Sequence, residues 1–142
     1  MINLRSSKFI IKALICLVFL SGCTPPQATN SSAQLDLACA LVNGWPEDYA
    51  TIWPSAVKRH NESPDKISAG DEMTRYIDGA LALMTIDDSE AERLVDGYKS
   101  YWQLLEVDLI RGGGTIPDDP ISSGIVSSLM RSCDELGRGF SN

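Results

Sequence analysis

Apolar residues recur every three or four positions through most of this chain, and that spacing limits what it can fold into. From Ala33 to Leu136 the spacing places them on one face of successive α-helices. No segment shows the sustained alternation of apolar and polar residues that a half-buried β-strand requires. The sequence therefore predicts an all-α fold, a small bundle of four to five helices whose neighbours run up and down.

Five segments carry the helical pattern, and polar residues, glycines and prolines separate them. The predicted helices cover about 33–42, 46–58, 69–84, 90–110 and 120–136, with a polar loop at 59–66 and a fraying tail after 136. Ser68 is expected to cap the third helix, and Asp88 or Ser89 the fourth. Pro54 lies inside the second pattern, where it removes a backbone donor, so a kink or a restart is expected at Trp53-Pro54.

The first 23 residues have the layout of an export signal. Arg5, Lys8 and Lys12 form a basic leader, and a continuous apolar run of eight residues follows at 13–20. A helix needs about 20 apolar residues to cross a hydrocarbon core, so this run is too short to do so. A short apolar run behind a basic leader is typical of a secretory signal peptide.

The end of that signal, Leu20-Ser21-Gly22-Cys23, resembles the lipobox of bacterial lipoprotein precursors, and all four positions match. The resemblance covers these first residues only and does not bear on the fold that follows. It implies that Cys23 receives a diacylglycerol on its sulfur and that cleavage after Gly22 removes residues 1–22. Thr24 is not the Asp associated with inner-membrane retention in this family, so the resemblance favours the periplasmic face of the outer membrane in a Gram-negative host. An ordinary secretory signal with a chance cysteine is the alternative.

Processing at this position would leave one domain on a short tether. Residues 23–32 hold the lipidated cysteine and a small, polar, proline-bearing segment, and 33–142 form the predicted bundle. The leader takes with it three of the twelve basic residues, so nine basic residues face nineteen acidic ones and the formal net charge moves from −7 to −10. Phosphate backbones and anionic head groups repel such a surface. We therefore expect no nucleic-acid partner, and a membrane contact through the lipid alone.

Two of the four cysteines remain for the fold. Cys16 leaves with the signal and Cys23 carries the lipid, which leaves Cys39 and Cys133. An even pair in an exported protein predicts a disulfide, and both residues lie on the core stripes of their helices. Reactive thiols or a metal pair are the alternative, although no histidine or further cysteine lies near either residue in the sequence.

No arrangement of residues predicts a catalytic or metal centre. His60, the single histidine, lies among solvated residue types, so we expect an exposed loop histidine without a catalytic role. Acidic pairs recur at four places, and a Ca²⁺ site built from two loops is the alternative to helix capping, although no EF-hand motif supports it. The pairs are Asp71-Glu72, Asp87-Asp88, Asp118-Asp119 and Asp134-Glu135. The glycines at 112–114 predict a helix end and not an anion-binding loop. We therefore expect that the protein is not an enzyme and that it binds no cofactor.

The aromatic residues leave one binding hypothesis open. Tyr98, Tyr101 and Trp102 share a helical face and, with Trp45 and Trp53, could line a groove for a peptide, a glycan or a lipid, although aromatic residues at this spacing more often form a core. The sequence as a whole predicts a membrane-anchored extracytoplasmic lipoprotein that acts as a binding or assembly module of the cell envelope, with an envelope protein as a possible partner. A small-ligand carrier with an aromatic groove is the alternative, and an enzyme is less favoured.

Overall fold

The computed structural model describes residues 30–65, 67–116 and 122–139, and within these ranges the chain is helical and has no β-strand. The elements are α2 (Ser31–Asn43), α3 (Trp45–Glu47), the π-helical turn η2 (Asp48–Ile52), α4 (Trp53–Glu62), α5 (Ala69–Leu81), α6 (Ser89–Arg111) and α7 (Ser123–Glu135). The predicted all-α bundle is confirmed. The predicted signal peptide at 1–22, Cys23 and the predicted tether up to residue 29 lie outside the described residues, as does the pair Asp118-Asp119.

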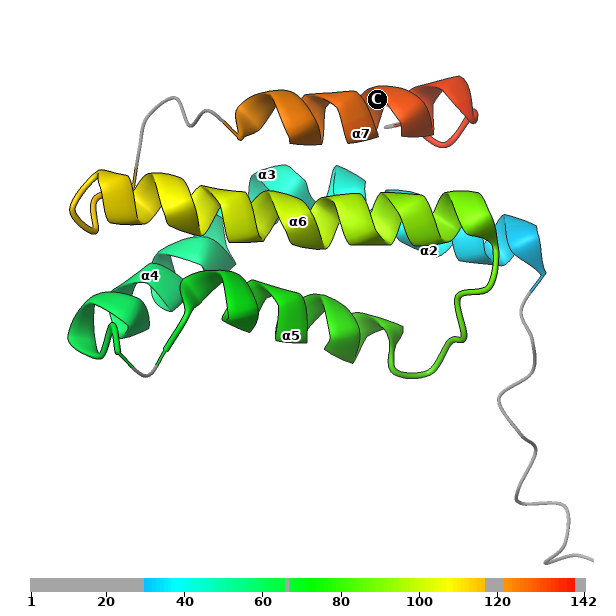
Figure 1. Cartoon of the computed structure of the whole chain (residues 1–142). Helices are drawn as coiled ribbons and strands as arrows, with labels where there is room; N and C mark the ends of the chain where they lie inside the picture. The colour runs from blue at the N-terminus through cyan, green and yellow to red at the C-terminus, as the bar shows by residue number, and fades with distance from the viewer. Residues whose placement is uncertain (1–29, 66, 117–121, 140–142) are drawn as a thin grey trace, which may run out of the picture.

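Helix α6 is the central element of the bundle (Figure 1). It packs against α2, α5 and α7, while α4 packs against α5 on the side away from α7. Its 23 residues make it about 35 Å long at ~1.5 Å per residue, long enough to touch all of these elements. A helix covered from several sides must be apolar on several sides, and nine residues of α6 are buried. None of the helices at 30–65, 67–116 and 122–139 combines the length and the hydropathy of a membrane span.

The second predicted helix is interrupted just before Pro54, as expected for a residue that lacks a backbone N–H. The turn η2 precedes it, and the N–H of Trp53 donates to the carbonyl of Asp48, five residues back, which is the π-helical bond. Pro54 then lies in the first turn of α4, where a missing donor is tolerated. Helix α4 continues to Glu62, so the prediction of a loop from residue 59 is wrong for its first four residues.

Side-chain caps fix the starts of three helices. Asn30 accepts from the N–H of Ala33 at 2.9 Å, so α2 begins at Ser31, within the predicted tether. Ser68 caps α5 as expected, and the cap of α6 is Asp88, which accepts two backbone N–H bonds. These bonds, above all the one from Ala91, hold the pKa of Asp88 below its usual value. Helix α6 ends at the glycines, where Gly113 and Gly114 have φ of 67° and 85°.

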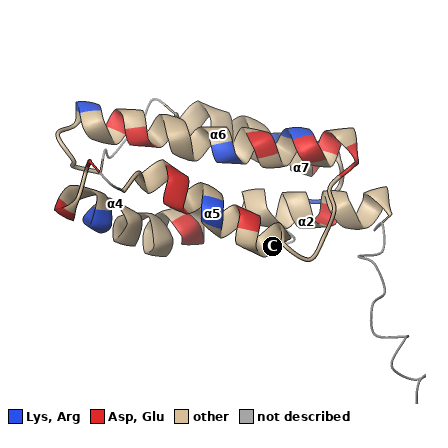
Figure 2. Ribbon diagram, turned by 60° about the horizontal axis from the view of Figure 1, so that its bottom comes forward, with Lys and Arg blue, Asp and Glu red and all other residues tan. Residues whose placement is uncertain are grey.

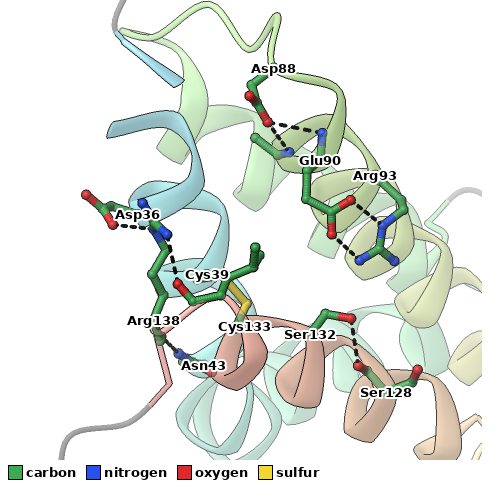
Figure 3. Close-up of a disulfide and its surroundings, with 12 residues drawn as sticks. Asp36, Cys39, Asn43, Asp88, Glu90, Arg93, Ser128, Ser132, Cys133 and Arg138 are labelled. Atoms are coloured by element: carbon green, nitrogen blue, oxygen red, sulfur yellow. Dashed lines mark hydrogen bonds and ion pairs between the residues drawn. A yellow bond between two sulfur atoms is a disulfide. The ribbon is translucent and has the colours of Figure 1, made fainter. Parts of the chain in front are cut away.

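A disulfide joins Cys39 in α2 to Cys133 in α7, as predicted, with the Cα atoms 5.6 Å apart (Figure 3). Arg138 lies beside it: its Nε donates to Asp36 at 2.7 Å, and its carbonyl accepts from Asn43 at 2.9 Å. The predicted fraying after residue 136 is therefore wrong for Arg138, which these bonds fix to α2.

The connection between α5 and α6 is held by a buried amide. Gln34 is 1% exposed, and its Oε1 accepts from the backbone N–H groups of Asp87 and Asp88, both at 2.8 Å. Its Nε2 donates to the carboxylate of Asp87. A single side chain of α2 thus supplies the partners that a buried loop backbone needs.

Candidate functional site

The aromatic stripe singled out from the sequence lies in the core. Tyr98, Tyr101 and Trp102 are fully buried, and the ring centroid of Trp102 is 4.9 Å from that of Tyr101 and 5.5 Å from that of Trp53. Only Trp45 reaches the edge, where its indole N–H donates to the hydroxyl of Tyr101 at 2.8 Å. Burial raises the pKa of Tyr101 to about 12, so this hydroxyl stays protonated at neutral pH. None of these five aromatic residues lines either of the two surface pockets considered next.

A groove of ≈390 Å³ lies between α4 and α5. Its apolar lining comes from Ile52, Ala56 and Met73, and its polar lining from Arg59, Glu72, Arg75 and the hydroxyl-bearing Tyr76. Ala56 and Met73 are fully buried by the surrounding helices, and Tyr76 is 41% exposed. The volume falls within the range of sites that bind small molecules, and so does the combination of an apolar floor with a few polar groups.

A buried carboxylate adjoins this groove. Asp48, on η2, is 6% exposed and accepts from the hydroxyls of Tyr98 at 2.9 Å and Tyr76 at 3.2 Å. Burial raises the pKa of Asp48 above its usual value, and the two tyrosine bonds act against that rise. Burial and the nearby Asp48 charge also raise the pKa of Tyr98, so both hydroxyls remain donors. The carboxylate therefore ties η2 to α5 and α6 and fixes the position of Tyr76 in the groove wall.

Replacing Asp48 with asparagine tests this assignment. A carboxylate whose folded-state pKa is raised contributes stability that is fully present below its unfolded pKa and is lost as the pH rises through its folded pKa. We therefore expect the free energy of unfolding of Asp48→Asn, relative to the wild type, to rise between about pH 3 and about pH 7. Urea titrations at both pH values measure the difference. Asp96→Asn, at an exposed position of α6, is the matched control; a difference at position 48 that falls with pH would contradict the assignment.

The second pocket, of ≈160 Å³, lies between α6 and α7. Leu104, Val107 and Ile125 supply its apolar lining, and Asp108, Arg111 and Ser122 its polar lining. Asp108 accepts from the backbone N–H of Ser122 at 3.2 Å, which links the two helices. This pocket is less than half as large as the groove between α4 and α5, so the groove is the stronger candidate site.

His60 is buried, and its predicted place in an exposed loop is wrong. It lies in the last turn of α4, 8% exposed, with Nδ1 2.8 Å from the carbonyl of Ile67 and 3.5 Å from a carboxylate oxygen of Glu106. It continues the helical face of Trp53 and Val57, a spacing visible in the sequence. The residue type indicates exposure, but the carbonyl of Ile67 and the carboxylate of Glu106 give the buried Nδ1 polar partners, so burial of this nitrogen is tolerated.

Glu106 also contacts Ser68, but Ser68 and His60 do not form a nucleophile–base pair. Its Oε2 accepts from the hydroxyl of Ser68 and from the N–H of Gly70 at the start of α5. Ser68 in turn accepts from the N–H of Asp71 at 3.0 Å. The serine hydroxyl thus donates to a carboxylate and caps a helix, and its proton is not directed at His60. The cluster fastens α4 and α6 to the first turn of α5.

Two of the three acidic pairs that the structure describes lie at helix starts. Asp71-Glu72 lies in the first turn of α5 and Asp87-Asp88 at the start of α6, as capping and the helix dipole predict. Asp134-Glu135 lies at the other end of its helix, in the last turn of α7. In the described part of the chain no three histidine, cysteine, aspartate or glutamate side chains gather in a way that could hold a metal ion.

The described residues thus define a small disulfide-linked helical bundle with an amphipathic groove between two helices. No model of a known protein family matches the chain, and neither curated proteins nor solved structures show significant similarity to it.

Proposed function

We propose that the chain is a lipid-anchored extracytoplasmic lipoprotein whose bundle serves as a binding or assembly module of the cell envelope. The observation that carries the proposal is the lipobox-like Leu20-Ser21-Gly22-Cys23 directly after a short apolar run. The disulfide between Cys39 and Cys133 supports it independently, because structural disulfides persist in oxidising compartments and are rare in the cytosol. In a Gram-negative host, Thr24 after the cysteine favours the periplasmic face of the outer membrane.

The position of the first described residues suits such an anchor. The described chain begins at Asn30, and Gln34, one helical turn further on, is bonded to Asp87 and Asp88 at the start of α6. The tether therefore joins the bundle at the end where α6 begins (Figure 1). Two acyl chains on Cys23 would hold the protein on a bilayer where one chain gives only reversible binding. With the anchor at that end of the bundle, the groove between α4 and α5 would lie along its side, open to other envelope components.

A small-ligand carrier is the second candidate, and the groove between α4 and α5 favours it. The accessible apolar surface of Ile52 and Tyr76 beside the charged Arg59 and Arg75 is an arrangement that binds ligands of mixed character. The site differs from the predicted one, because Tyr98, Tyr101 and Trp102 belong to the core.

Replacing Cys23 with alanine tests the anchor. Labelled palmitate is expected to enter the wild type in growing bacterial cells and not to enter Cys23→Ala, because the thiol that would carry the diacylglycerol is gone. The variant is also expected to accumulate as the uncleaved precursor. Cys16→Ala removes a thiol from the apolar run and is the matched control, which should be labelled like the wild type. Equal labelling of Cys23→Ala and the wild type would refute the proposal.

A further inference from the structure

The residues that line the groove between α4 and α5 include two arginines, on a protein that is acidic as a whole. Two guanidinium groups, of Arg59 and Arg75, and one carboxylate, of Glu72, line it. The whole chain has 19 acidic residues against 12 basic ones, so a groove with this balance departs from the rest of the molecule. Both α4 and α5 carry basic residues (Figure 2). The carboxylate of Asp48 is buried behind Tyr76, so the charges that a ligand can contact in the groove are those of the exposed side chains of its wall.

One of the two guanidinium groups is already engaged. The Nε of Arg59 donates to both carboxylate oxygens of Glu72, at 2.8 and 3.0 Å. This pair joins α4 to α5 across one side of the groove. Glu72 pairs with Arg59 and forms no ion pair with Arg75, so Arg75 is the guanidinium of the described groove residues that remains for a ligand.

Arg75 forms no ion pair with any residue that the structure describes. Each carboxylate about one turn away on its own helix has another partner: Glu72 pairs with Arg59, Asp71 accepts from the amide of Gln103 at 3.0 Å, and Asp78 pairs with Lys99. The guanidinium is thus left exposed at the groove with five N–H donors in a planar fork, a geometry that matches carboxylate and phosphate oxygens.

The rest of the groove wall is apolar and fixed in place. Ala56 and Met73 lie beneath it in the core cluster and are fully buried, so its accessible apolar surface comes from Ile52, a half-buried residue at the end of η2, and from Tyr76. Tyr76 adds a ring whose hydroxyl is bonded to the buried Asp48 at 3.2 Å. A wall already held by these contacts loses little further freedom when a ligand binds, which favours affinity.

We propose that this groove binds an amphiphilic anion, with its apolar chain on Ile52 and the ring of Tyr76 and its anionic head on Arg75. A carboxylate or a phosphate satisfies the fork, and the molecule can come from solution or from a lipid surface. The inference rests on the proposed role as a binding module and names the chemistry of what is bound. A cation with the same chain would place a charge of the wrong sign beside Arg75 and is expected to be rejected.

Calorimetric titration with three ligands of one chain length tests the proposal. The protein is purified from the envelope of expressing cells into phosphatidylcholine nanodiscs, and empty nanodiscs give the blank. Octanoate and octyl phosphate are expected to bind, and octyltrimethylammonium to bind at least about tenfold more weakly. Equal affinity for the anions and the cation, or no binding of either anion, would overturn the proposal.

Substitutions separate the head-group contact from a general charge effect. Arg75→Glu is expected to weaken octanoate binding at least about tenfold, and Arg75→Lys to retain most of it, because lysine keeps the charge without the fork. Arg131→Glu, at an exposed position of α7 on the far side of α6, is the matched control and should stay within about twofold of the wild type. Circular dichroism verifies that each variant is folded. Octanoate affinity that is unchanged in Arg75→Glu, or lowered equally in Arg131→Glu, would place the anion elsewhere.

Two further experiments complete the test. The first distinguishes a lipid head group from a free anion as the natural ligand, and the second distinguishes a failure of the anchoring proposal from a failure of this inference. If a lipid head group is the natural ligand, replacing part of the phosphatidylcholine with phosphatidylglycerol should weaken octanoate binding by competition, and a free anion predicts no such effect. If palmitate labelling fails, the same titration is run on the soluble protein. Anion binding without a lipid anchor would contradict only the anchoring, and an anchor without anion binding would contradict only this inference.

Discussion

Replacing both Cys39 and Cys133 with alanine is expected to lower the free energy of unfolding by about 4–5 kcal/mol. The two residues are 94 positions apart, and the chain-entropy relation assigns that amount to closing so long a loop in the unfolded state. Small domains have about 5–15 kcal/mol of net stability, so the double variant loses a large share of it. Urea denaturation of the wild type and Cys39→Ala/Cys133→Ala, followed by circular dichroism, measures the difference.

The chemical state of the thiols provides the control. In unfolded, unreduced protein both cysteines should resist alkylation, and after reduction both should react. Wild type unfolded under reducing conditions should then match the double variant, because both lack the same constraint. Free alkylation before reduction, or a double variant as stable as the oxidised wild type, would contradict the assignment.

Trp102→Ala is expected to cost about 3–5 kcal/mol, the range for removing a large buried aromatic side chain. Trp102 is fully buried at the centre of α6, with Tyr98 and Tyr101 of its own helix and Trp53 of α4 around it. Its removal leaves a cavity that three rigid rings cannot readily fill. Thermal and urea denaturation both report the loss.

Leu104→Ala is the matched control for Trp102→Ala. Leu104 lies two residues further along the same helix and is 46% exposed, so its truncation should change the stability by no more than about 0.5 kcal/mol. The comparison of the two variants also tests whether the aromatic residues around Trp102 form a core or line an open groove. If Trp102→Ala cost no more than Leu104→Ala, the aromatic residues would line an open surface and not a core.

The helical architecture could be predicted because its signals are local. Apolar spacing, capping residues and the glycines at 112–114 each act within one or two turns, and the structure confirms the helices they indicated. The pairing of Cys39 with Cys133 is a long-range contact, but only two cysteines were expected to remain in the fold, so the choice was limited. Pro54 likewise predicted an interruption, because proline lacks the backbone N–H that would otherwise bond within the same helix.

The polar clusters could not be predicted because their partners are distant in the sequence. Gln34 meets Asp87 across 53 positions, and Asp48 meets Tyr98 across 50. Their residue types suggest exposure, whereas burial depends on partners that only the packing supplies. Tyr76 shows the opposite case: it lies at helical spacing from the fully buried Met73 and Ile77, yet it is 41% exposed, where it forms a wall of the groove.

The groove depends on how two helices pack and not on a motif in either. Arg59 and Arg75 belong to separate helices, and only the packing of α4 on α5 brings them to one cavity. No signal in the sequence indicated Arg75 as a site residue. Arg75 is a candidate because Asp71 and Asp78, its neighbours on α5, bond to Gln103 and Lys99 of α6 and not to Arg75.

The covalent link between the first and last helices has a mechanical consequence for a protein tethered at one end. Under the proposed anchoring, a partner that pulls on the bundle applies tension through the tether to the start of α2. That tension meets Cys39 after little more than two turns of helix, and from there it divides between the rest of α2 and the sulfur bridge into α7. Peeling the helices one after another from the anchored end would require both routes to give way together. The bundle is therefore expected to resist tension as a unit.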